Sequence, residues 1–198
     1  MDVTKLFDCP KIIGVVGDVN SGKSMVLYNI INKIMDYNPN LYHFGLRCDI
    51  PNSTRVYSIK EIESVTNSII IIDELSSLFD LDDRKQKKLI ENTFRLLNHN
   101  NNVIILCGVP ENFKKFVSSK VNQIFYKTST ISDFINGSSI KHTLTSFNGN
   151  QRGSEMLNMR KDEALYYDGS HYTIIPVEYL EDYDTKKHNQ NILQKRGD

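Results

Sequence analysis

Eight residues, GDVNSGKS at 17–24, constrain the fold of this 198-residue chain more than any other stretch. They follow the short apolar run KIIGVV at 11–16, whose β-branched residues and terminal glycine are typical of a buried strand. They precede residues 23–36, where apolar residues recur with the spacing of one helix face. A strand that turns through a glycine-rich loop into a helix predicts an α/β fold with a parallel sheet.

The same eight residues fit the pattern G-x-x-x-x-G-K-[ST] without deviation. In this pattern the backbone N–H groups of the loop point at a phosphate, the lysine reaches the β- and γ-phosphates, and the hydroxyl ligates Mg²⁺. The dipole of the following helix adds positive potential. The alternative is a glycine turn that binds nothing. We predict a site for ATP and Mg²⁺, with these nucleotide-binding residues: Gly17, Asp18, Val19, Asn20, Ser21, Gly22, Lys23, Ser24 and Met25.

Alternating strands and helices continue to about residue 128, which predicts a parallel sheet covered on both faces. The helix predicted at 84–98 should turn Leu89, Ile90, Thr93, Phe94, Leu96 and Leu97 inward. Further strands are expected at 41–46, 68–73, 103–108 and 122–127, and further helices at 59–65 and 111–120.

Turn signals dominate after residue 128, with NG at 136–137, NGN at 148–150 and DG at 168–169. Residues 164–175 are expected to form a β-hairpin, and 177–183 a last helical turn. We expect one domain over residues 1–198, with a core at about 10–128, a β-rich part at about 129–183 and a frayed tail at 184–198.

Composition indicates a soluble protein of a reducing compartment. Lysine and arginine number 24, as do aspartate and glutamate, so any nucleic-acid surface must be local. Cys9, Cys48 and Cys107 have no paired spacing, which argues against a disulfide framework or a zinc site. No secretory signal is evident, and no run approaches the ~18 apolar residues of a membrane span. We expect a cytoplasmic location.

The apolar run at 68–73 ends in an acid, Asp73, and a second acid, Glu74, follows it directly. Because ligands of parallel sheets bind at the carboxyl ends of the strands, these acids should lie at the same edge as the loop. Asp73 would hold Mg²⁺ through water, and Glu74 would orient the water that attacks the γ-phosphate. A strand end meeting solvent is the alternative. A water-activating carboxylate also argues against a small-molecule kinase, which must exclude water.

Arg95 is a candidate arginine finger. With Ile90 at zero and about 100° per residue, the apolar residues of the helix centre near about 310° and Arg95 lies near about 140°. It could therefore project into a neighbouring subunit's site. The alternative is an exposed i, i+4 pair of Glu91 with Arg95. The competing arginines are Arg84, Arg152 and Arg160.

Taken together, GDVNSGKS, NSIIIIDELSSLF, RLLNHNNNVIILCGVPENFKKF and the tail RGSEMLNM…ALYYDG resemble the FtsK/HerA superfamily of DNA-translocating ATPases. The similarity spans most of residues 11–183 and is nearest to the small genome-packaging ATPases of tailless viruses with internal membranes and of related mobile elements. It implies an additional-strand P-loop NTPase fold, with a RecA-like parallel sheet flanked by helices and strand 103–107 between strands 11–16 and 69–73. It also implies a homo-oligomeric ring, a hexamer, with double-stranded DNA in its pore and Arg95 acting in trans.

Two details of the resemblance concern residues 107–120. The superfamily often has a glutamine sensor at the end of the fourth strand, whereas this chain has ILCGVPEN, where Asn112 or Glu111 could substitute. Lys114, Lys115 and Lys120 lie close together and are candidate DNA-backbone contacts, with a solvated helix face as the alternative.

The sequence therefore predicts an ATP-driven translocase of double-stranded DNA, most simply a viral genome-packaging motor. Such a motor would work in the host cytoplasm or on the virion, with a capsid or membrane vertex protein as a possible partner. A nucleotide-binding switch that hydrolyses slowly and a P-loop small-molecule kinase are the alternatives. Glu74 disfavours the kinase, and DNA stimulation of hydrolysis would disfavour the switch.

Overall fold

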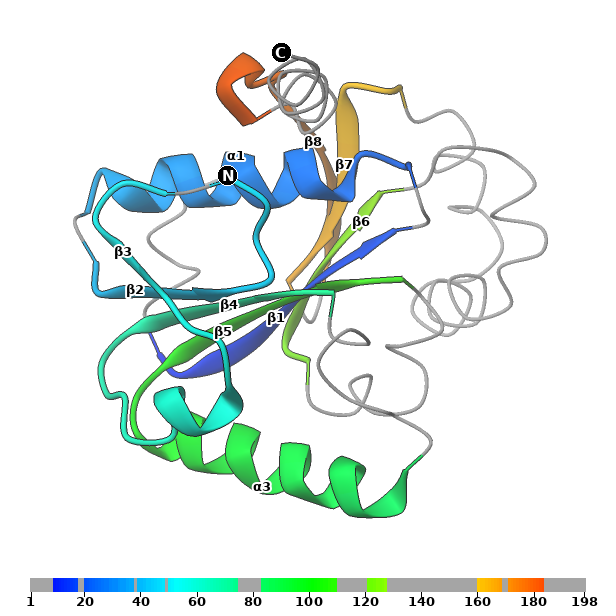
Figure 1. Cartoon of the computed structure of the whole chain (residues 1–198). Helices are drawn as coiled ribbons and strands as arrows, with labels where there is room; N and C mark the ends of the chain where they lie inside the picture. The colour runs from blue at the N-terminus through cyan, green and yellow to red at the C-terminus, as the bar shows by residue number, and fades with distance from the viewer. Residues whose placement is uncertain are drawn as a thin grey trace, which may run out of the picture.

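A mixed β-sheet organises the chain (Figure 1). The computed structural model describes residues 9–17, 20–37, 39–48, 50–74, 83–109, 121–127, 160–168 and 171–183. These residues build an eight-stranded sheet in the order β3-β2-β4-β5-β1-β6-β7-β8. The strands are β1 (Lys11–Gly17), β2 (Leu41–Phe44), β3 (Ser53–Arg55), β4 (Ile69–Asp73), β5 (Val103–Gly108), β6 (Gln123–Lys127), β7 (Glu163–Tyr167) and β8 (Tyr172–Pro176). The helices are α1 (Lys23–Met35) and α3 (Arg84–His99), with 3₁₀ turns η2 (Ile59–Ile62) and η3 (Glu181–Tyr183).

The first six strands are parallel, as the alternation of strands and helices predicts. β5 lies between β1 and β4, which confirms the strand order implied by the resemblance. β1 is central: Ile13 pairs with Ile105 of β5 on one side and with Gln123 of β6 on the other. The carboxyl ends of these strands therefore gather at one edge of the sheet.

The predicted hairpin at 164–175 is confirmed as β7 and β8, which pair antiparallel with each other. β7 also pairs antiparallel with β6, where Phe125 lies opposite Tyr166. The hairpin thus extends the parallel sheet beyond β6.

The two faces of the sheet carry separate halves of the core. In β1, Ile13 and Val15 belong to the cluster that contains α1, whereas Ile12 and Val16 belong to the cluster that contains α3. This alternation follows from the two-residue period of a strand. Figure 1 shows α1 on one face and α3 on the other, as expected for a sheet covered on both sides.

Helix α3 is rotated relative to the sequence prediction. Ile90, Phe94 and Leu97 are buried, but Leu89 is 47% and Leu96 45% exposed, so their predicted inward orientation is wrong. The buried stripe follows the i, i+4, i+7 spacing of one helix face. Leu89 and Leu96 each precede a stripe residue, which turns them about 100° away from it.

Three shorter differences concern the strand and helix ends. β2 ends at Phe44, before the predicted boundary at 46, and β3 was not predicted because three polar residues carry no periodic signal. The helix predicted at 59–65 is only the 3₁₀ turn η2, since the bonds that close it run from i+3 to i. The helix predicted at 111–120 lies outside the described residues.

The segment after β8 packs on α1. Asn29 of α1 donates to the Glu178 carbonyl oxygen at 2.7 Å and accepts from its N–H at 2.9 Å. The ring of Tyr183, in η3, stacks on that of Tyr28 with centroids 4.6 Å apart. The helical turn predicted at 177–183 is thus confined to η3. Within the part of the chain that is described, no helix is both long and apolar enough to cross a bilayer.

Candidate phosphate-binding site

The phosphate loop and the two acids share the carboxyl edge of the sheet. β1 ends at Gly17 and β4 at Asp73, and each lies beside the end of a further strand, since Gly17 pairs with Lys127 and Asp73 with Cys107. Glu74 follows Asp73 directly. The parallel sheet therefore brings together residues that are more than fifty positions apart in the chain, as the sequence predicts.

The loop has a backbone that glycine makes possible at two points. A Cβ at Gly17 would clash with the carbonyl oxygen of Lys127 and with the hydroxyl of Ser21. Gly22, the N-cap residue of α1, has φ 95°, in the left-handed region that side chains disfavour. Asn20 also lies there, with φ 64°. The chain consequently turns tightly between β1 and α1.

The amino end of α1 begins with a backbone turn, in which the Met25 N–H donates to the Gly22 carbonyl oxygen at 3.0 Å. Among the described residues, no side chain caps it, and its first turn contains no acid. Helix α3 shows the contrast, because its N-cap Asp83 accepts a hydrogen bond from the Lys85 N–H at 2.8 Å. An uncapped amino end presents N–H donors and the positive end of the dipole, which is the arrangement that binds an anion.

Two polar side chains of the loop are buried beside this helix end. Lys23 is 8% exposed, and the Ser21 hydroxyl is buried with no hydrogen-bond partner among the described residues. Buried polar groups are normally paired, so this hydroxyl is available to a ligand. The phosphate oxygens of a nucleotide are acceptors that would satisfy both groups.

Asp73 is a buried acid, and one oxygen of its carboxylate has no hydrogen-bond partner among the described residues. Burial raises the pKa of Asp73, and the neighbouring Glu74 charge adds to this, while a hydrogen bond from Cys107 and the charge of Lys23 act in the opposite direction. Its Oδ1 is buried and has no hydrogen-bond partner among the described residues. A carboxylate oxygen left in this state suits a water-bridged Mg²⁺ ion, for which Ser24 would supply a hydroxyl ligand.

Glu74 has an unusual backbone. Its φ is 54°, a conformation that few residues other than glycine adopt, whereas its side chain is exposed at the sheet edge. Strained residues of this kind concentrate at functional sites, because the surrounding structure must hold them there. The positive φ therefore marks Glu74 as a candidate functional residue at the end of β4.

Arg95 lies near the amino ends of the central strands, whereas the phosphate loop lies at their carboxyl ends. It lines a hollow of about 410 Å³ together with Ile12, near the start of β1, and Asn122, just before β6. The end of α3 is fixed at this edge, since Asn100 accepts a hydrogen bond from the Asn67 N–H at 3.1 Å, just before β4. Arg95 is exposed and far from the phosphate loop of its own chain.

The competing arginines have different positions. Arg84 begins α3 and is exposed. Arg160 is engaged with Asp162 and Glu163, each at 3.1 Å. The other predicted site residues lie outside the described residues: Asp18, Val19, Glu111, Asn112, Lys114, Lys115, Lys120 and Arg152.

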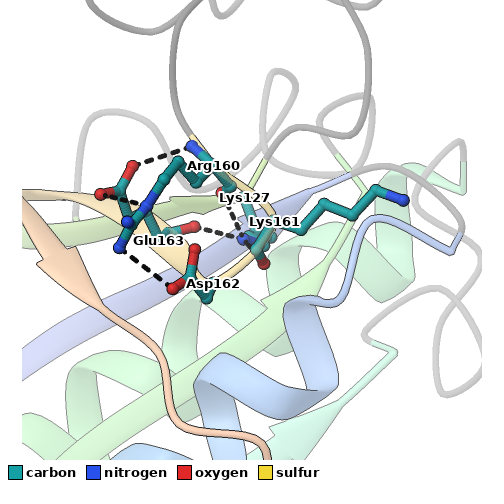
Figure 2. A network of polar contacts seen from close by, with 5 residues as sticks. All are labelled: Lys127, Arg160, Lys161, Asp162 and Glu163. Carbon is teal, nitrogen blue, oxygen red and sulfur yellow. Dashed lines mark hydrogen bonds and ion pairs between the residues drawn. The ribbon is translucent and has the colours of Figure 1, made fainter.

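Two residues of the site were not predicted from the sequence. Cys107, fully buried, contacts Asp73, and burial together with the Asp73 charge raises the pKa of its thiol. Lys127 is 3% exposed, ends β6 beside Gly17, and turns its ammonium toward the turn at 160–163 (Figure 2). A lysine that closes an apolar strand at the ligand-binding edge is a signal that could have been noticed.

The strand order, the uncapped helix and the glycine loop together give the α/β fold of the P-loop NTPases. No protein-family model matches the chain, and no curated protein sequence matches it either. Solved structures do match. The genome-packaging NTPase B204 of Sulfolobus turreted icosahedral virus 2, in complex with ATP-gammaS, aligns with a TM-score of 0.61 and 13% identity over 90% of this chain and 100% of its own.

Two further structures have the same fold. B204, the DNA-packaging ATPase of Sulfolobus turreted icosahedral virus, aligns with a TM-score of 0.60 and 13% identity over 86% of this chain and 100% of its own. The pCW3 conjugation coupling protein TcpA aligns with a TM-score of 0.59 and 16% identity over 95% of this chain and 65% of its own. At these identities the likeness establishes the fold, and the fold is the one that the FtsK/HerA resemblance implied.

Proposed function

We propose that this chain binds ATP with Mg²⁺ at residues 17–25 and hydrolyses it. Lys23 and the N–H groups at the start of α1 bind the β- and γ-phosphates. Glu74 accepts a proton from the attacking water and orients it. Ser24 and Asp73 hold the Mg²⁺ ion, which neutralises developing charge on the phosphates when bound.

The observation that carries this proposal is the set of unsatisfied groups at one edge of the sheet. Among the described residues, the amino end of α1 has no side-chain cap, and the buried Ser21 hydroxyl and the buried Asp73 oxygen have no hydrogen-bond partner. Lys23 lies in the first turn of the same helix, and its charge acts on Asp73. A phosphate with its Mg²⁺ ion would satisfy donors and acceptors together. An empty glycine turn would leave these groups unpaired at a cost of about 1–3 kcal/mol for each.

We further infer that hydrolysis drives the translocation of double-stranded DNA. Two different DNA-moving systems, viral genome packaging and conjugation, provide structures with this fold, and both were solved with ATPγS or another nucleotide bound. Viral genome packaging is the form that we favour, because the packaging NTPases match over 98–100% of their own length. A homo-oligomeric ring, a hexamer, would thread the DNA, with a capsid or membrane vertex protein as a docking partner in the cytoplasm.

The position of Arg95 supports such a ring. Arg95 lies eleven residues after the start of α3, or roughly 16 Å along the helix axis, from the edge that carries the phosphate loop. An arginine at that distance cannot reach the γ-phosphate of its own chain. It is exposed, so a neighbouring subunit could place its own site against it.

The test is the rate of ATP hydrolysis by the purified chain, with and without linear duplex DNA. Wild-type hydrolysis should require Mg²⁺ and rise when DNA is added. Lys23→Ala should lose both nucleotide binding and turnover, whereas Lys33→Ala, in the last turn of the same helix, should keep them. Turnover of Lys23→Ala at the wild-type rate would exclude this loop as the site.

Glu74→Gln separates binding from chemistry. It keeps the shape of the side chain, so ATP should still bind, but hydrolysis should fall by roughly 10²–10⁴ with the loss of the general base. A mutant that loses binding and turnover together would make Glu74 a structural residue. If the ring assembles and added DNA does not change the rate of hydrolysis, the result would favour the nucleotide switch.

A further inference from the structure

Lys127 occupies an unusual position for a lysine. It is the last residue of β6, is 3% exposed, and pairs across the sheet with Gly17, the first residue of the phosphate loop. Lysine is almost never fully buried unless it is paired. A buried cation directly beside a proposed phosphate site therefore needs a physical account.

The ammonium group of Lys127 is held by backbone carbonyl oxygens (Figure 2). Its Nζ donates to the carbonyl oxygens of Lys161 at 2.6 Å and Arg160 at 3.4 Å, and to that of Glu163. Three acceptors match the three donors of an ammonium, so this geometry selects the charged form. Burial lowers the pKa of Lys127, while the charges of Asp162 and Glu163 oppose that shift.

The turn that supplies these carbonyl oxygens is itself fixed. The guanidinium of Arg160 contacts Asp162 and Glu163 at 3.1 Å each, and the Arg160 N–H donates to the Glu163 carboxylate at 2.8 Å. The Glu163 N–H in turn donates to the Arg160 carbonyl oxygen at 3.1 Å. The carbonyl oxygens that bind the Lys127 ammonium thus belong to a turn at the start of β7, which its own hydrogen bonds and ion pairs close.

The stem of Lys127 lies against the phosphate loop. A Cβ placed at Gly22 would lie 3.5 Å from its Cε and 3.9 Å from its Cγ, and one placed at Gly17 would lie 3.3 Å from its Cβ. One side chain therefore lies beside both glycines of the loop, in the space that a Cβ would face, and ends at the 160–163 turn. It is a physical connection between the loop and the β7–β8 hairpin.

We propose that Lys127 is a positioning residue, which holds the phosphate loop in its binding conformation and fastens it to the start of β7. The proposal rests on the nucleotide site proposed above and adds the hairpin to it. Nucleotide bound in the loop immobilises Gly22, Gly22 restricts Lys127, and Lys127 restricts the 160–163 turn. Binding that orders one element in this way orders the elements tied to it.

The first test compares three variants by nucleotide affinity and turnover. Lys127→Met keeps a long apolar stem but removes the charge and its donors, and should weaken ATPγS binding and raise KM for ATP by about tenfold while kcat changes little. Lys127→Arg keeps a charge and donors, and should restore part of that affinity. Lys11→Met is the matched control, because Lys11 is a buried lysine of β1 at the opposite edge of the sheet.

These variants distinguish positioning by a held cation from simple packing. A stem that only fills space would be replaced better by methionine than by arginine, so Lys127→Met binding ATPγS as tightly as the wild type would overturn the proposal. An equal loss of affinity in Lys127→Met and Lys11→Met would overturn it too, since it would show a general loss of stability.

The second test rests on the wild-type chain, with Lys127→Met as an added comparison, so it holds even if that variant does not fold. Amide hydrogen exchange is measured with and without ATPγS. The amides of residues 20–26 and those of β7 should both exchange more slowly with the nucleotide, and in Lys127→Met only the loop should respond. Slower exchange in the loop with none in β7 would overturn this inference alone. No change in either would overturn the proposed nucleotide site as well.

Discussion

Asp73 has a position that serves ligand binding at the expense of stability. Its carboxylate is buried, and burial raises its pKa, so the ionised form is less favourable in the folded state than in the unfolded state. In the absence of Mg²⁺ we expect Asp73→Asn to raise the melting temperature by a few degrees, which corresponds to about 1 kcal/mol in a domain of this length. The same variant should lose Mg²⁺-dependent hydrolysis. Calorimetry without metal and an ATPase assay measure the two effects.

The sign of the pH dependence follows from the raised pKa. Below the usual value of 3.8, Asp73 is protonated in both states and destabilises neither. As the pH rises from that value to the higher folded-state pKa, the unfolded state ionises first, so the folded state loses stability until the group is ionised in both states. The advantage of Asp73→Asn should therefore be larger at neutral pH than in acid. Asp36→Asn, which changes an exposed acid, should alter stability by less than about 0.5 kcal/mol.

The residues that sequence alone identifies are those whose chemistry requires a fixed spacing. Lys23, Ser24 and Asp73 belong to short motifs, and the edge at which they meet follows from the parallel sheet. The partners of Lys127 could not be found in this way, because they lie 33 to 36 residues away and are backbone carbonyl oxygens. A carbonyl oxygen carries no residue identity, so no pattern marks it.

Helix α1 is held on its outer side by the segment that follows β8. The amide of Asn29 bonds the Glu178 backbone in both directions and also donates to the Met25 carbonyl oxygen at 2.9 Å. Asn29→Ala removes these part-buried hydrogen bonds and should lower the free energy of unfolding by about 1–3 kcal/mol, as urea denaturation would show. Asn32→Ala, on the exposed side of the same helix, is the control and should have little effect. Equal effects would mean that the 177–183 segment does not stabilise α1.

Helix α3 shows how far periodicity determines an element. The sequence predicts its length and its amphipathic character. The predicted buried face was too wide, since six apolar or small residues could not all face the sheet. Ile90→Ala should cost about 2–5 kcal/mol of unfolding free energy, because Ile90 is fully buried. Leu89→Ala should cost less than about 1 kcal/mol, because Leu89 is 47% exposed. Similar losses in chemical denaturation would contradict the observed rotation.

At the scale of the whole molecule, the phosphate loop and Arg95 lie at opposite edges of one sheet. If a ring forms, Arg95→Ala should leave folding and nucleotide affinity nearly unchanged and reduce turnover by on the order of 10³ or more. Glu74→Gln should also be inactive. Its defect lies in the subunit that binds the nucleotide, whereas the missing Arg95 belongs to the neighbouring subunit.

Mixing the two inactive variants tests this arrangement. In a mixed ring some contacts pair an intact Glu74 with an intact Arg95, so partial ATPase activity should return. If both variants assemble and mixing restores nothing, Arg95 is not the trans-acting arginine. Arg84 and Arg152 are then the next to substitute, because Arg160 is already engaged by two carboxylates.

The central place of β1 has a consequence for the order in which the chain is made. β1 leaves the ribosome well before its neighbours β5 and β6, which begin only at Val103 and Gln123. At roughly 5–20 residues per second, both edges of this apolar strand remain without their native partners for several seconds or more. During synthesis the nascent chain therefore exposes a strand that is prone to aggregate, and the proposed nucleotide site is incomplete until β5 and β6 have paired with β1.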